Sequence, residues 1–293
     1  MPLAAVALVL VSAISHAYWN LLAKQAHDKL VFTWLIYFTG GFVMLPLAIW
    51  GLLTEPVDPR MWLCTLGTSL SFCVYGVSLA RAYGRGDMSI VYPLVRGTGP
   101  VMTVLFAHLF LGERLNLFGY MGILFIVSGA VGLTWPRYDP HSEVDRATFR
   151  RRQLAVLAPA LVTGTMIAVF SVIDKVGVTL ASPLFYNCTT FWGTAFMLAP
   201  LVLHRRSSTA VLKVWRTSQR ALWMIGALNV LGYLLVLYAF RLAPASYVIA
   251  LRSTSVLFAV ALGTHVLREG CGWQRVALGA LIVVGLGLVS VAG

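Results

Sequence analysis

Long apolar stretches recur along the whole sequence and constrain its fold more than any other feature. Each is about 20 residues long, the length that an α-helix needs to cross the hydrocarbon core of a bilayer. Ten stretches meet this length: 3–23, 30–53, 61–82, 88–111, 116–135, 154–174, 181–203, 221–240, 244–267 and 273–292. Stretches of this kind satisfy their backbone groups in lipid by forming helices. The sequence therefore predicts an all-α integral membrane protein with ten transmembrane helices.

Composition supports this prediction and excludes most soluble classes. Hydrophobic residues make up 59% of the 293 residues and charged residues only 11%, against about 25% charged residues in soluble domains. The net charge of +12 does not indicate a nucleic-acid partner, because most basic residues cluster in the short connections between apolar stretches, as topogenic residues do. We expect this protein to lie in the lipid bilayer and to bind no nucleic acid.

Motifs of metal sites and of common enzymes are missing from the sequence. The four cysteines have no spacing typical of metal ligands. The sequence contains no nucleotide-binding loop and neither the Gly-x-Ser-x-Gly nor the His-Glu-x-x-His motif of hydrolases. We therefore expect no metal, no cofactor and no enzymatic activity.

The two halves of the chain resemble each other. Residues 3–135 and 154–292 each contain five apolar stretches, and a polar connecting segment, 136–153, separates them. Three pairs of identical residues are 156 positions apart: Arg96 and Arg252, Thr98 and Thr254, and Glu113 and Glu269. An odd number of helices per half makes the second half enter the membrane from the opposite side, as in transporters with inverted repeats. We predict two inverted five-helix repeats.

Several local motifs resemble those of one transporter family. They are His16-Ala-Tyr-Trp-Asn20 with Lys24 behind it, the segment Gly86-Asp-Met-Ser-Ile-Val-Tyr-Pro-Leu-Val-Arg96, Leu111-Gly-Glu-Arg114, and Leu251-Arg-Ser-Thr-Ser-Val-Leu-Phe258. In this order, and with five-plus-five helices, the chain resembles the EamA-type carriers of the drug/metabolite transporter superfamily. The resemblance covers essentially the whole chain. It implies export or exchange of a small-molecule substrate and does not identify that substrate.

The charges of the connections and the family resemblance favour opposite orientations in the membrane. If the termini were inside the cell, the inner connections would hold four basic residues and the outer connections sixteen. Basic residues concentrate on the cytoplasmic side of membrane proteins, so the charges favour both termini outside. The family resemblance favours both termini inside. We expect a multi-pass protein of the inner or plasma membrane, as a monomer or a homodimer.

Two arginines, Arg96 and Arg252, lie deep within apolar stretches. Arg96 is about eight residues into its helix, which corresponds to ~12 Å of depth and is close to the middle of the bilayer. An arginine at this depth costs at least ~2.5–3.5 kcal/mol and marks a functional site. Inverted repeats bring such equivalent residues together, so both arginines should line one central cavity, with Thr98 and Thr254 beside them.

The chemistry of arginine indicates an anionic ligand. Its planar fork of donors matches a carboxylate or a phosphate in two parallel hydrogen bonds. All ten acidic residues are expected in connections or at helix ends: Asp174 next to Lys175, its expected partner, and Glu113 in a surface pair with Arg114. No acid would then neutralise the arginines. The alternative is a structural role in which each arginine bonds backbone carbonyls, lines a wet cleft or reaches an acid at a helix end.

The stretch around Arg96 contains residues that weaken helices. Pro100 leaves the carbonyl of Arg96 without its donor, Pro93 adds a second break, and Gly97 and Gly99 lower helix propensity further. Unwound backbone inside a membrane is tolerated where it lines a cavity. We therefore predict a kink or gate here, with a stiffer equivalent helix around Arg252. A plain packing kink is the alternative.

Polar and aromatic residues on two other segments complete the predicted site. Asn20 and Trp19 near the end of the first stretch are candidate substrate ligands, as is Tyr92, four residues before Arg96. His16 shares a helix face with Asn20, and it could exchange a proton near neutral pH. An interhelical hydrogen bond is the alternative role of His16.

These observations predict a secondary active transporter, an exporter or exchanger of a small organic anion or amphoteric metabolite that works by alternating access. A proton-coupled exporter of lipophilic cations is an alternative, although two arginines would repel a cation. A membrane enzyme or a non-transporting scaffold remains a third hypothesis.

Overall fold

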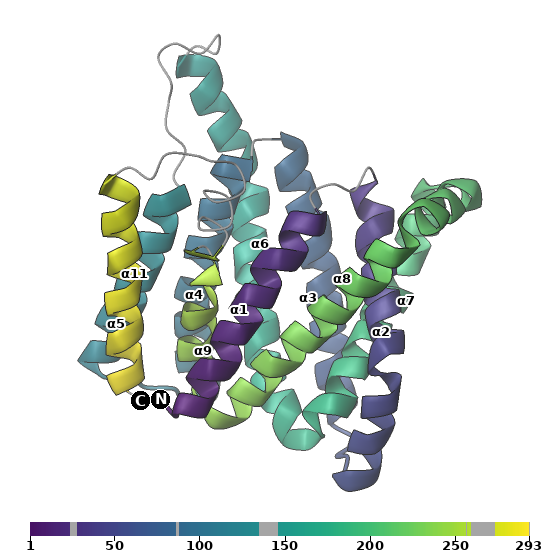
Figure 1. Ribbon diagram of the computed structural model, residues 1–293, viewed down its shortest axis with the longest axis horizontal. Helices are drawn as coiled ribbons and strands as arrows, with labels where there is room; N and C mark the ends of the chain where they lie inside the picture. The colour runs from purple at the N-terminus through teal and green to yellow at the C-terminus, as the bar shows by residue number, and fades with distance from the viewer. Residues whose placement is uncertain (24–27, 86–87, 135–145, 256, 259–272, 293) are drawn as a thin grey trace.

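A computed structural model of the 293-residue chain describes all residues except 24–27, 86–87, 135–145, 256, 259–272 and 293. The described residues form the helices α1 (Leu3–Ala23), α2 (Lys29–Thr54), α3 (Met61–Arg85), α4 (Met88–Leu111), α5 (Leu117–Thr134), α6 (Arg146–Leu180), α7 (Pro183–Arg205), α8 (Ser208–Leu242), α9 (Ala245–Arg252) and α11 (Trp273–Ala292). Figure 1 shows them as one helical bundle with both termini at the same end.

Several of the described helices have the length and composition of membrane spans. Five of them contain segments long and apolar enough to cross a membrane: 30–54, 61–82, 94–111, 157–180 and 208–242. Shorter apolar segments occupy 3–16, 117–132 and 276–289. Large apolar side chains cover the outer surface, for example Trp50, Leu63 and Phe110, which are 65%, 72% and 71% exposed. The prediction of an all-α, multi-pass membrane protein is confirmed.

Two helices extend into segments that the sequence predicted to be polar connections. α6 begins at Arg146, so the last part of the 136–153 connection is helical and projects beyond the bundle. α8 begins at Ser208 and runs through the expected 204–220 connection, with one non-helical residue, Ser218, in between. Arginine, lysine and alanine have high helix propensity, and the adjoining apolar spans provide the nucleus from which these polar turns propagate. A polar composition alone therefore does not show that a segment between two spans is non-helical.

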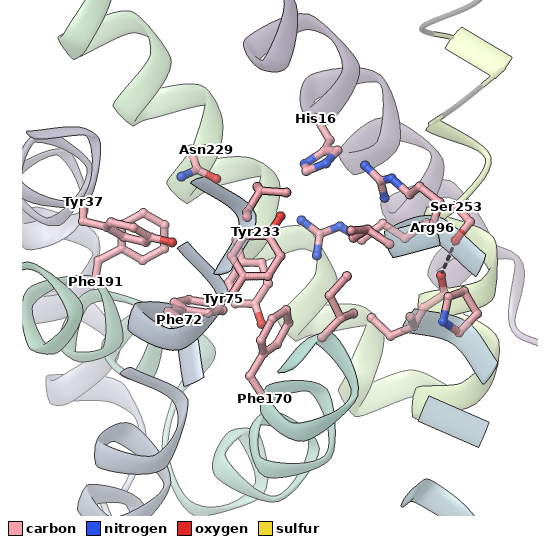
Figure 2. A pocket seen from close by; sticks show the side chains of 16 residues that line it. His16, Tyr37, Phe72, Tyr75, Arg96, Phe170, Phe191, Asn229, Tyr233 and Ser253 are labelled. Atoms are coloured by element: carbon pink, nitrogen blue, oxygen red, sulfur yellow. Dashed lines mark hydrogen bonds between the residues drawn. The ribbon is translucent and has the colours of Figure 1, made fainter. Parts of the chain in front are cut away.

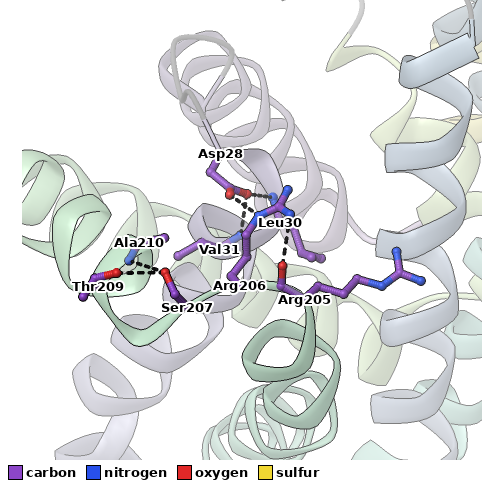
Figure 3. Close-up of polar contacts among 8 residues, drawn as sticks. All are labelled: Asp28, Leu30, Val31, Arg205, Arg206, Ser207, Thr209 and Ala210. Carbon is purple, nitrogen blue, oxygen red and sulfur yellow. Dashed lines mark hydrogen bonds and ion pairs between the residues drawn. The ribbon is translucent and has the colours of Figure 1, made fainter.

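The junction between α7 and α8 lies at the end of the bundle opposite the termini. Asp28 caps α2, where its carboxylate accepts hydrogen bonds from the backbone N–H groups of Leu30 and Val31. The same carboxylate pairs with Arg206 at 2.5 Å, and Ser207 caps α8 through the N–H of Ala210 (Figure 3). This network connects the start of α2 to the turn between α7 and α8.

Helix packing follows an exchange symmetry between the two halves. α5 packs against α11, α2 against α7 and α4 against α9, and each of these pairs joins equivalent helices. Several of the other contacts come in matched pairs: α1–α8 with α3–α6, α2–α8 with α3–α7, and α4–α6 with α1–α9. Exchanging the halves maps these contacts onto one another, as a pseudo-two-fold axis requires. The inverted-repeat prediction is confirmed.

One of these symmetric contacts depends on glycine. A Cβ atom on Gly122 of α5 would lie 2.8 Å from the carbonyl oxygen of Gly285, and a Cβ on Gly285 of α11 would lie 2.6 Å from that of Gly122. No side chain fits between the two backbones at this crossing. Small residues at such contacts allow the close approach that drives helix association in lipid.

Polar contacts close the end of the bundle that holds the termini. Arg241 at the end of α8 pairs with Glu55 at 2.6 Å and donates to the carbonyl oxygens of Val178 and Ala181 at 2.8 and 3.0 Å. Lys175 on α6 donates to carbonyl oxygens near the end of α8, those of Phe240 and Ala243. The expected pair of Lys175 with Asp174 is therefore wrong, because the two side chains leave α6 in different directions.

Glu113 makes the other major contact at this end. One carboxylate oxygen accepts from the N–H of Ala245 at 2.6 Å, and the other accepts from the N–H and hydroxyl of Ser246 at 3.2 and 2.7 Å. These donors are the free groups of the first turn of α9, which favour an anion. The expected surface pair of Glu113 with Arg114 is wrong: the glutamate caps a helix of the opposite repeat.

Candidate functional site

A cavity of about 130 Å³ lies between the two repeats (Figure 2). Its lining comes from α1–α4 of the first repeat and α6–α9, with the turn after it, of the second. Polar lining residues are His16, Arg96, Asn229, Arg252 and Ser253, and aromatic ones are Tyr37, Phe72, Tyr75, Phe170, Phe191 and Tyr233. The cavity therefore combines a few cationic and polar groups with a largely aromatic wall, which is typical of small-molecule sites.

Arg96 and Arg252, 156 positions apart in the sequence, both line this cavity. The inverted packing of α4 against α9 brings them together from the two repeats. The guanidinium carbon of Arg252 lies 5.3 Å from the centroid of the Tyr233 ring, within the range of a cation–π contact. Its Nε is buried without a hydrogen-bond partner among the described residues. This donor is available to a ligand; the role of both arginines as substrate ligands stays a prediction.

The helix break near the site falls in the other repeat from the one expected. α4 is a continuous helix through Gly97, Gly99 and Pro100 in this structure, without the expected unwinding, and the predicted gate at these residues stays a prediction. α9 instead ends at Arg252, and two tight turns follow: Ser253 donates its N–H to Ala250 and Thr254 to Leu251. The arginine of the second repeat therefore sits at a helix end that lines the cavity.

Close packing explains why α4 stays continuous. A Cβ on Gly97 would lie 2.8 Å from the Cγ2 atom of Val131, and one on Gly99 would lie 3.2 Å from the Cδ1 atom of Ile167. The glycines that lower helix propensity thus let α5 and α6 approach closely on both sides. Pro100 is buried and lines the cavity. Tertiary contacts outweigh the local cost of the proline here.

The two threonines beside the arginines serve packing in this structure. Thr98 lies against Gly164 of α6, where a Cβ would come within 2.5 Å of the threonine Cβ. Thr254 is buried, and its hydroxyl donates to the carbonyl oxygen of Leu251 at 2.7 Å. Neither is part of the described cavity lining. The predicted contact of both threonines with substrate stays a prediction.

The other predicted ligands are placed only in part. His16 of α1 lines the cavity (Figure 2). The side chains of Trp19, Asn20, Tyr92 and Pro93 fall outside the described part of the structure. Their predicted roles therefore stay predictions.

Asp174 is a functional candidate that the sequence analysis missed. It is 0% exposed, and its carboxylate accepts hydrogen bonds from three hydroxyl groups, those of Thr68 at 2.6 Å, Tyr186 at 2.7 Å and Tyr233. α6 continues for six residues beyond it, to Leu180. The expectation that every acid lies in a connection or at a helix end is therefore wrong. The apolar run that follows Lys175 was the signal that the helix continues.

Asp174 also changes the charge balance of the site. Tyr233 bonds the carboxylate through its hydroxyl and lies under Arg252 with its ring. Two arginines and one carboxylate leave one net positive charge when all three are ionised. Such a site still favours an anion, or a zwitterion that presents its acidic group to the arginines. Among the described residues no cluster of histidine, cysteine and acidic side chains could hold a metal ion.

Comparisons with known proteins agree with this architecture. A family model described as "EamA-like transporter family" matches residues 3–135 and 154–291. A curated relative from Sinorhizobium sp, "Uncharacterized transporter in cobO 3'region", is 38% identical over 75 residues, which are 26% of this chain and 52% of the relative. The chain thus spans about half the length of this relative.

A solved structure described as "Crystal structure of protein" is similar with a TM-score of 0.76. The match covers 98% of this chain and 96% of that chain at 17% identity. At this identity the likeness concerns the fold alone.

Proposed function

Because the chain belongs to the EamA-like transporter family, we propose that it is a secondary active transporter of a small organic anion or amphoteric metabolite, working by alternating access. One observation carries the choice of substrate: Arg96 and Arg252, one from each repeat, line the same cavity. Charged groups at this depth are expensive, and guanidinium groups recognise carboxylates and phosphates in a fixed geometry. A lipophilic cation would meet two positive charges instead.

The cavity limits the size of the substrate. A water molecule needs about 10–15 Å³ on this scale, so a cavity of about 130 Å³ suits a molecule of roughly ten non-hydrogen atoms. The aromatic wall adds apolar contact area around the charged group. A small carboxylate with a short apolar or aromatic body fits both properties.

Alternating access needs a closed side and an open side. The contacts of Arg241, Lys175 and Glu113 close the end that holds the termini. Basic residues of the α7–α8 region lie at the opposite end: Arg205, Arg206, Lys213, Arg216 and Arg220. By the positive-inside rule we assign that end to the cytoplasm of a cell membrane, with both termini outside. The conformation described here is then closed toward the outside.

Transport in proteoliposomes tests the proposal. Labelled mono- and dicarboxylates and an amphoteric amino acid serve as probes, with tetraphenylphosphonium as the cationic comparison. Arg96→Gln and Arg252→Gln should each reduce transport of the anionic probe at least ~10-fold, because one charge-assisted hydrogen bond contributes roughly 1.5–3 kcal/mol. Arg114→Gln, at an exposed position of the α4–α5 connection, is the control and should transport like the unmodified protein.

Two results would refute the anion proposal. One is full activity of both cavity variants toward every anionic probe that the unmodified protein transports. The other is transport of tetraphenylphosphonium with none of the anions, which would establish the cation exporter instead.

A further inference from the structure

The carboxylate of Asp174 is held in a cluster of hydroxyl groups that joins four helices. Thr68 comes from α3, Tyr186 from α7 and Tyr233 from α8, and all three bond the carboxylate on α6. Thr68 and Tyr186 also lie 3.0 Å apart, hydroxyl to hydroxyl. Every member is buried. Burying a carboxylate costs free energy, so a cluster of this kind at the core of a transporter indicates a functional role.

The cluster lies between the cavity and the closed end of the bundle. Tyr233 lines the cavity on one side of the cluster. On the other side, Lys175, the next residue of α6, bonds carbonyl oxygens near the end of α8. α6 ends six residues beyond Asp174, or ~9 Å at 1.5 Å per residue. Opening the closed end would therefore expose Asp174 from that end of the bundle.

The hydrogen bonds of the cluster can accommodate one additional proton on Asp174. Four hydrogen-bonding contacts connect its members, three to the carboxylate and one between Thr68 and Tyr186. The three hydroxyl groups supply three protons, because each hydroxyl has one to donate. When Asp174 is protonated, its carboxyl group can donate this proton to the hydroxyl of Thr68. Thr68 then donates to Tyr186, so each of the four contacts has a donor and an acceptor. The cluster can hold both the ionised and the neutral acid without an unpaired group.

We propose that Asp174 is the binding site of a coupling proton, which the transporter carries together with its anionic substrate. This inference rests on the proposed transport function. The carboxylate takes one proton from water that reaches the cluster and becomes a neutral acid. It returns that proton to water on the other side after the change of access.

The surrounding charges set the direction of coupling. Ionised Asp174 partly offsets the positive charge of Arg252 across the Tyr233 ring. The neutral acid leaves that charge uncompensated, so the anion binds more tightly once the proton is bound. Coupling between two ligands is reciprocal, so the anion also promotes proton binding. Proton and anion therefore move in the same direction.

The other titratable groups near Asp174 do not replace it in this role. Cys64 on α3 and Tyr186 on α7 face it, and both are less acidic than a carboxylate. Lys175, on the same helix, is bound to carbonyl groups of α8 and its connection to α9. Arg96 on α4 and His16 on α1 line the cavity itself. Asp174 is the carboxyl group among these neighbours.

Infrared difference spectroscopy of the purified, reconstituted protein tests the site with the proton itself as the ligand. Between about pH 8 and about pH 5, where exposed carboxyl groups mostly stay ionised, we expect a band of a buried carboxylic acid to appear. Asp174→Asn should abolish this band, whereas Asp58→Asn, at a partly exposed position, should leave it. Absence of the band from the unmodified protein, or its persistence in a folded Asp174→Asn variant, overturns the proposal.

A second variant keeps the test valid if Asp174→Asn does not fold. Tyr233→Phe keeps the ring and removes the hydroxyl donor to the carboxyl group, so the frequency of the band should shift. Tyr37→Phe is the matched control, because Tyr37 also lines the cavity and is not among the residues whose hydroxyl groups bond Asp174. An unchanged frequency in Tyr233→Phe contradicts the assignment to Asp174.

Transport measurements with a proton gradient distinguish a failure of the proton site from a failure of the proposed function. An inward proton gradient should accelerate uptake of the anionic probe by the unmodified protein and not by Asp174→Asn. If anion transport that depends on the cavity arginines ignores the gradient, the proton site is refuted and the function stands. If the band of Asp174 appears and no anion is transported, the function is refuted and proton binding stands.

Discussion

Replacing Glu113 by glutamine measures how strongly the two repeats are held together at the closed end. The substitution keeps the size of the side chain and one acceptor oxygen, and it removes the charge and the second acceptor. The amide oxygen can replace the carboxylate oxygen that accepts from Ser246. The lost contact is then the charge-assisted hydrogen bond from the N–H of Ala245, worth roughly 1.5–3 kcal/mol. The favourable interaction of a carboxylate with a helix start adds roughly 0.3–1 kcal/mol. Because the amide oxygen retains part of this, we expect a loss of about 2 kcal/mol.

Thermal unfolding in detergent, followed by circular dichroism, measures this loss. The shift is ~2–4 °C per kcal/mol for chains of 150–250 residues and somewhat smaller for longer chains, so the melting temperature should fall by roughly 4 °C. Arg114→Gln, one residue away and exposed, is the control and should melt like the unmodified protein. A surface pair between these neighbours would be worth under ~1 kcal/mol. Equal, small effects of both substitutions would therefore refute the helix cap described here.

The remaining predictions concern packing and the second closing contact. Gly285→Ala should destabilise the protein by about 1–3 kcal/mol, the usual cost of overpacking, because its new methyl group meets the Gly122 carbonyl. Gly287→Ala, on the same helix and in open space, should be neutral or stabilising by up to ~1 kcal/mol; equal melting temperatures of the two variants would contradict the close contact. Arg241→Gln should raise the accessibility of a cysteine introduced at Val178 to a membrane-impermeant maleimide, because three bonds at this end depend on its guanidinium. Unchanged labelling would show that Arg241 does not hold the closed end.

The helices were predictable because the apolar length of each segment is a local property of the sequence. Their inverted arrangement was predictable because it depends only on the number of helices in each half. Apolar length determines a span wherever lipid surrounds the helix, and five helices per half determine the inversion. The arginines were identifiable for the same reason: a charge in an apolar stretch is visible without its neighbours. The packing that brings Arg96 and Arg252 to one cavity then follows from the repeat.

Features that depend on distant partners were not predictable in this way. Asp174 was taken for a helix end because an acid next to Lys175 resembles a membrane boundary, and only the three hydroxyl groups from other helices make a buried position tolerable. Glu113 was assigned to its sequence neighbour, while its partner is the start of α9, more than a hundred residues away. Both errors arise because sequence proximity says little about which charge a carboxylate meets.

The break in α9 shows how the two repeats differ in what they can do. α4 carries Arg96 within a continuous helix that α5 and α6 clamp through its glycines. Arg252 instead lies at the end of α9, beside two tight turns, so α9 and its guanidinium can shift without moving the segment that follows as one continuous helix. Interrupted helices at the membrane centre place their free polar groups at the substrate in many transporters. We therefore expect Arg96 to fix the position of the anion and Arg252 to respond to it, which puts the moving cationic group beside Tyr233 and the Asp174 cluster.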